Sequence, residues 1–60
     1  MTYTEAEQKL FAGETKIRRL AWSGNAVLAL DNNIPQLLDL DYGAYWDLTN
    51  EDKAATDWEG

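Results

Sequence analysis

The sequence predicts an α+β fold: an N-terminal helix packed on a small antiparallel sheet of three to four strands, with a short C-terminal helix. Three observations predict it. Residues 4–12 have helical apolar spacing and end at a glycine, residues 15–42 hold alternating stretches separated by turn residues, and Thr49 begins a second helical pattern. At 60 residues the chain is expected to form one domain, residues 1–60.

The first helix has a capping signal at its start and a glycine at its end. Thr4 with Glu7 fits a capping box, and Thr2 with Glu5 fits equally well. Gly13 stands where a helix-terminating glycine is expected. A helix this short needs an apolar surface to lie on, so it should pack on the sheet. Its apolar side consists of Tyr3, Ala6, Leu10 and Phe11.

Four segments are predicted as strands. Residues 15–22 and 36–42 alternate, residues 26–31 are more continuously apolar, and residues 44–48 form a short strand or an extended lead-in. The turn after the second strand contains Asn32-Asn33, which tolerates the positive φ angles of a tight hairpin. Short connections of this kind predict antiparallel pairing.

The last helix is predicted to begin at Thr49. Threonine is a favourable N-cap, and Glu51 and Asp52 lie in the first turn, where the helix dipole favours carboxylates. The helix should last one or two turns. Trp58 lies near its expected end, and we expect this ring to pack the closing helix onto the core rather than to contact a ligand.

Composition removes several kinds of chemistry. The chain has no cysteine and no histidine, so disulfides, thiolate metal sites and a histidine general base are excluded. Small domains without such supports often self-associate, and a homo-oligomer is expected. The net charge of −6 argues against binding duplex nucleic acid through a basic face. The sequence predicts no membrane span and no signal peptide, hence a soluble, cytoplasmic protein.

No catalytic constellation is visible, so no enzymatic activity and no cofactor are predicted. Asp39 and Asp41 are two apart on a predicted strand, which suits either a metal site or a solvated face. Trp22, next to Arg18 and Arg19 and ahead of a Ser-Gly turn, could stack a base near a bound phosphate. The alternative is that Trp22 packs under the first helix.

Two segments carry a resemblance to a known family. The first is Arg19-Leu20-Ala21-Trp22-Ser23-Gly24. The second is a spaced set of residues near the C-terminus: Trp46, Thr49, Asp52, Ala55, Asp57 and Trp58. In this order they resemble the Thoeris anti-defence type-two family of phage proteins, whose members sequester nucleotide immune signals. Residues 3–24 and 46–59 are covered by the likeness.

The resemblance implies a function without turnover. It implies a homo-oligomer with pockets between or beside subunits, located in the host bacterial cytoplasm, that binds a cyclic ADP-ribose-type signal or a cyclic oligonucleotide. Arginine would contact phosphate, tryptophan would stack on a base or shape the pocket, and the turn and threonine would supply hydrogen bonds. The expected ligand-binding residues are Arg18, Arg19, Trp22, Ser23, Gly24, Trp46 and Thr49.

A second hypothesis belongs to another class. Residues 25–45 are much shorter than the family's usual middle segment, and Ala21 and Ser23 replace the family's glycine and asparagine. A chain without the pocket would be a compact acidic domain that inhibits a host defence protein by direct contact, with Asp39 and Asp41 among its contact residues. Nucleotide binding and direct protein contact are the two functions that the sequence leaves open.

Overall fold

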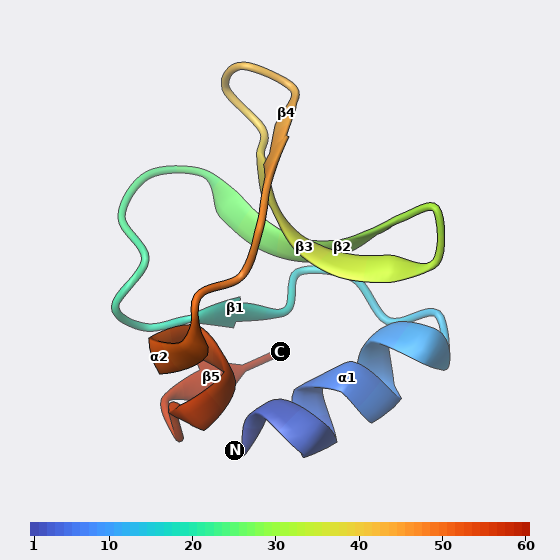
Figure 1. The fold of residues 1–60 in the computed structure, drawn as a ribbon, viewed down its shortest axis with the longest axis vertical. Helices are drawn as coiled ribbons and strands as arrows, with labels where there is room; N and C mark the ends of the chain where they lie inside the picture. The colour runs from blue at the N-terminus through green and yellow to red at the C-terminus, as the bar shows by residue number, and fades with distance from the viewer.

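The computed structural model describes all 60 residues, Met1–Gly60. It contains α1 (Tyr3–Phe11), β1 (Arg18–Arg19), β2 (Ala26–Asp31), β3 (Ile34–Asp39), β4 (Ala44–Trp46), α2 (Asn50–Ala54) and β5 (Trp58–Glu59), as Figure 1 shows. The predicted α+β class, with an N-terminal helix, an antiparallel sheet and a short C-terminal helix, is confirmed. The strands form two sheets, a three-stranded one in the order β2-β3-β4 and a two-stranded one of β1 and β5.

Helix α1 is set by its ends. Thr2 is the N-cap, and its side chain and that of Glu5 satisfy each other's backbone N–H groups, so the earlier of the two predicted registers is the observed one. At the other end Gly13 has a φ of 95°, and the N–H groups of Gly13 and Glu14 bond the carbonyls of Leu10 and Lys9. This paired C-terminal pattern needs a left-handed residue, which glycine supplies without strain.

The β2–β3 hairpin forms as predicted. Asn32 and Asn33 have φ angles of 52° and 64°, and their neighbours Asp31 and Ile34 pair across the turn. Pro35 is opposite Leu30, at a position whose nitrogen points away from β2. Strand β4 pairs only with residues 37–39 of β3, so the missing N–H of proline breaks no ladder bond.

Three strands are shorter than the sequence predicts, and of residues 44–48 only Ala44–Trp46 form β4. In the first of the three, Lys16 has a φ of 66°, which interrupts the extended backbone, so β1 begins only after this residue. At the other end, the Trp22 N–H donates to the Arg19 carbonyl in a turn that ends the strand. Of the predicted strand 15–22, only the two residues of β1 therefore pair in a sheet. Likewise β3 ends at Asp39, and Leu40 belongs to the following turn, with 55% of its surface exposed.

The core lies between α1, the near face of β2 and the β1–β5 pair. It consists of five buried residues: Ala6, Leu10, Ile17, Leu28 and Trp58. Trp58 is buried as predicted, but it lies on β5 opposite Arg19 and not at the end of α2. Figure 1 shows both helices and the β1–β5 pair on one side of the β2–β3 hairpin. No helix is long and apolar enough to span a membrane.

Candidate functional site

The two motif segments meet at the side chain of Arg19. Its Nη1 lies 2.7 Å from Asp52 Oδ1 in α2, and its Nε lies 2.8 Å from Asp57 Oδ1, just before β5. Only 11% of the Arg19 side chain is exposed. The guanidinium is therefore neutralised and hydrogen-bonded by the protein's own carboxylates. It is one of the two arginines that the resemblance assigns to phosphate contact.

Asp52 makes hydrogen bonds with more residues of the two motif segments than any other residue does. Its Oδ1 also accepts from the Trp22 indole N–H at 3.2 Å, and its backbone carbonyl accepts from the Trp58 indole N–H at 3.0 Å. Its Oδ2 accepts from the Thr49 N–H at 3.0 Å, while the Asp52 N–H donates to Thr49 Oγ1 at 3.1 Å. We call this hydrogen-bonded set of Arg19, Trp22, Thr49, Asp52, Asp57 and Trp58 the Asp52 junction.

Local sequence explains how the junction is held. Thr49 and Asp52 form a capping box, which fixes the carboxylate at the first turn of α2. Asp57 also accepts from the Ala21 N–H at 3.0 Å, and its carbonyl accepts from the Leu20 N–H at 3.0 Å. The turn that follows β1 is thus tied to the segment before β5, and this brings the Trp22 ring to α2.

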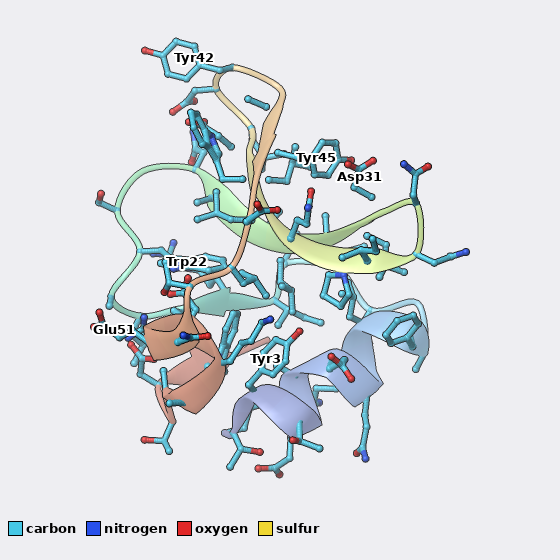
Figure 2. The ribbon with its side chains drawn as sticks, in the orientation of Figure 1. Tyr3, Trp22, Asp31, Tyr42, Tyr45 and Glu51 are labelled. Carbon is cyan, nitrogen blue, oxygen red and sulfur yellow. The ribbon has the colours of Figure 1, made fainter.

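The tryptophans divide into two structural groups. Trp22 and Trp58 pack edge to face with ring centroids 5.1 Å apart, and Tyr3 packs on Trp58 at 5.6 Å. Figure 2 shows Trp22 close to α2, on the side of the sheet where Tyr3 lies. Trp46 belongs to neither pair and is 62% exposed. Trp22 is thus half-buried and packs against the core through Trp58.

The ionisation of the junction depends on these contacts. Burial alone would raise the pKa of Asp52, but hydrogen bonds from Thr49, Arg19 and Trp22 outweigh it, so its pKa is below the ordinary value. The hydrogen bond from Arg19 is the main cause that lowers the pKa of Asp57. The same two carboxylates raise the pKa of Arg19. All three groups are charged at neutral pH.

These pKa shifts predict acid sensitivity. Because both carboxyl pKa values are lower in the folded chain, the stabilisation is complete above the unfolded pKa of about 3.9 and is lost as pH falls through it toward the folded values. The urea midpoint should be nearly constant from about pH 6 to 8 and should fall below about pH 5. Asp57→Asn should flatten this acid slope, whereas Glu59→Gln should leave it unchanged. An identical slope for Asp57→Asn and the parent chain would contradict the assignment.

Of the other predicted site residues, three lie next to the junction and Trp46 lies apart from it. Arg18 donates to the carbonyls of Trp22 and Arg19, so its guanidinium folds back on the turn. Ser23 and Gly24 are exposed next to it, and Gly24 has a φ of 72°, which favours glycine. Trp46 lies on β4, apart from the aromatic pairs of the junction.

Asp52 and Asp57 were absent from the predicted site, although both belong to the motif. The sequence assigned Asp52 a capping role, which it has, but not its ion pair with Arg19. One sequence signal indicates such a partner: alternation over residues 15–22 places an arginine, Arg18 or Arg19, beside apolar residues on each face. A guanidinium that is largely buried needs hydrogen-bond acceptors, and a carboxylate is the acceptor that also balances its charge.

The main concavity lies elsewhere. A groove of about 460 Å³ runs between the 14–16 loop, β2 and two leucines of β3 and its turn, and none of the seven predicted ligand residues lines it. No group of three or more acidic side chains is placed to hold a metal ion. Asp39 and Asp41 are not on one strand as predicted, because β3 ends at Asp39 and Asp41 lies in the following turn, where its N–H donates to Asp39 Oδ1.

Comparisons with known proteins add no identification. No protein-family model matches the chain, and neither a curated protein nor a solved structure matches it.

Proposed function

We propose that this chain is a phage anti-defence protein that binds and sequesters a small nucleotide signal in the host cytoplasm. The observation that carries the proposal is the Asp52 junction. Residues of the first motif segment, Arg19 and Trp22, are bonded to residues of the second, Thr49, Asp52 and Asp57. Two segments that resemble one family in sequence thus form one unit in space.

The proposal changes the roles of three residues. Arg19 and Thr49 position the turn and α2, and Trp22 keeps its indole N–H on Asp52. Ligand contact then falls to groups next to the junction: the half-buried Arg18 guanidinium, the hydroxyl of the exposed Ser23 and the N–H of the exposed Gly24. An aromatic plane next to a cation and turn N–H groups suits a base and its phosphate.

Trp46 suggests how the site is completed. Its ring is large and exposed, and Arg18, Ser23 and Gly24 line no cavity within one chain. We therefore place the ligand at a contact between copies, where Trp46 of one copy stacks on the base that another copy's turn holds by its phosphate. Binding alone lowers the free signal by mass action, so no reaction is needed.

Calorimetry tests this proposal. The assembled protein should bind one or more members of a panel of cyclic ADP-ribose variants and cyclic di- and trinucleotides, and the ligand recovered after heat release should be chemically intact. Arg18→Gln and Trp46→Ala should each weaken binding at least about tenfold, on the scale of a lost charge-assisted bond or a lost stacking platform. Lys53→Gln, at an exposed cation on α2, is the matched control and should bind normally.

The solution mass is measured on the same samples. Binding with a mass above one chain supports a site between copies. Absence of binding to every member by the folded protein would reject nucleotide sequestration, and recovery of altered ligand would reject binding without turnover.

A further inference from the structure

One face of the three-stranded sheet has no covering element. The register places Val27, Leu38 and Tyr45 in one row across β2, β3 and β4, with their side chains on the same face. Leu28, on the opposite face, packs in the core under α1. In Figure 2, Tyr45 and Asp31 lie above the β2–β3 ribbon and Tyr3 lies below it. We define the open sheet face by its six apolar residues, Val27, Ala29, Ile34, Leu38, Leu40 and Tyr45.

The open sheet face is mostly apolar and accessible, and the register also places Gln36 on it, opposite Ala29. Ile34 is 57% exposed, Leu40 is 55% exposed and Tyr45 is 42% exposed. Val27, Ala29, Leu38 and Leu40 also line the groove of about 460 Å³, together with Leu10, Leu28 and Leu30 from the core side, so the groove borders this face along β2. A grouped apolar surface with a groove is typical of a binding site rather than of ordinary protein surface.

The border of this face is acidic. Asp31 pairs with Ile34 at one end, Asp47 accepts from Gln36 at 2.9 Å, and Asp41 accepts from Asn25 at 3.0 Å near the other end. Residues 20–52 contain no lysine or arginine, since the five basic residues are Lys9, Lys16, Arg18, Arg19 and Lys53. Lys16 is the one cation that lines the groove.

We propose that the open sheet face docks a basic segment of another protein, one with an apolar centre flanked by lysine or arginine. The apolar centre would fill the groove at Val27, Leu38 and Leu40, and its cations would face the carboxylates of Asp31 and Asp47. A second copy of this chain is a poor occupant, because it would bring the same carboxylates against them. This inference does not depend on nucleotide binding.

A pair of synthetic peptides tests the proposal. One is an amphipathic leucine–lysine peptide, and the other has the same leucine pattern with glutamate in place of lysine. The labelled protein is titrated with each and followed by amide chemical shifts. The basic peptide should move the signals of Val27, Leu38, Leu40 and Tyr45, and its affinity should fall as salt is added. The acidic peptide should leave these signals in place.

Matched variants distinguish binding at the open sheet face from general electrostatic attraction to an acidic protein. Leu40→Ser should weaken the basic peptide at least about fivefold, since it removes most of one buried leucine contact. Leu20→Ser changes a residue that is 64% exposed outside this face and should have no effect. Asp31→Asn with Asp47→Asn should weaken binding about threefold to tenfold, and Glu51→Gln with Glu59→Gln should not.

Three results would overturn the proposal: no shift with the basic peptide, equal binding of both peptides, or shifts spread over the acidic residues outside the face. Solution mass provides a further check. If the parent chain is oligomeric and Leu40→Ser, but not Leu20→Ser, makes it monomeric, a second copy occupies the face and the proposed partner is wrong.

Discussion

Replacing Asp52 with alanine is expected to lower the free energy of unfolding by about 3–5 kcal/mol, the usual cost of removing one partner from a buried ion pair. Asp52 is 7% exposed, and its carboxylate accepts from Arg19, Trp22 and Thr49. Without it, the guanidinium loses one of its two carboxylates and the indole N–H loses its acceptor. Since a 60-residue domain has about 3–9 kcal/mol of stability in total, this loss takes a third or more of it, and the variant should unfold at a much lower urea concentration.

Urea unfolding followed by far-ultraviolet circular dichroism measures the effect, with sulfate added where the variant needs a folded baseline. Glu51→Ala is the matched control, because Glu51 is an exposed carboxylate in the same first turn of α2. It should change stability by no more than about 0.5 kcal/mol. Asp52→Asn keeps the size of the side chain and should cost less than Asp52→Ala. Equal, small effects of Glu51→Ala and Asp52→Ala would contradict the junction as a structural unit.

The sequence predicts local structure correctly where that structure depends on residues a few positions apart in the chain. The helix caps at Thr2 and Thr49, the terminating glycine Gly13 and the turn at Asn32-Asn33 act over a few residues, and each is observed. For the first helix the sequence offers Thr4 as an equally good cap, and the structure selects Thr2. These signals also determine the order of elements. The fold class followed from them because a short helix next to an alternating hairpin has few ways to bury its apolar side.

Alternation misled where backbone geometry interrupts a strand. The positive φ of Lys16 has no sequence signal, because lysine is not a residue that favours it. The pattern from Gln36 to Tyr42 continued in sequence beyond the last paired residue, Asp39. Tyr42, predicted to share a face with Leu38, is instead 85% exposed at the tip of the turn before β4. Apolar type alone did not determine which side chains are buried.

The candidate site illustrates a different limit. Arg19 lies 33 residues from Asp52 and 38 from Asp57 in sequence, so their ion pairs depend on how α2 and β5 dock on β1. A motif shows that certain residues occur together, but it does not separate those that bind a ligand from those that hold the fold. Here Arg19, Trp22 and Thr49 belong to the Asp52 junction, and Arg18 donates to backbone carbonyls of Arg19 and Trp22. The predicted residues without a hydrogen bond in that network are Ser23, Gly24 and Trp46.

Substitutions of Trp58 and Trp46 test the division between residues that hold the fold and residues that are left to bind a ligand. Trp58→Ala should lower the free energy of unfolding by about 3–5 kcal/mol, since it empties a large buried site. Trp58 is 2% exposed and contacts both Tyr3 and Trp22. Trp58→Phe keeps most of the ring but removes the indole donor to the Asp52 carbonyl, and it should cost about 1–3 kcal/mol. Trp46→Ala should cost no more than about 0.5 kcal/mol because the ring is exposed.

Circular dichroism in urea gives these values without relying on tryptophan fluorescence, which each substitution changes. The order Trp58→Ala, Trp58→Phe, Trp46→Ala is expected from the largest loss to the smallest. A loss for Trp46→Ala as large as that for Trp58→Ala would mean that β4 is held by contacts absent from the single chain, as a subunit interface would provide. A folded, fully stable Trp46→Ala protein that no longer binds nucleotide would instead assign that ring to the ligand, because its loss would then affect binding without affecting the fold.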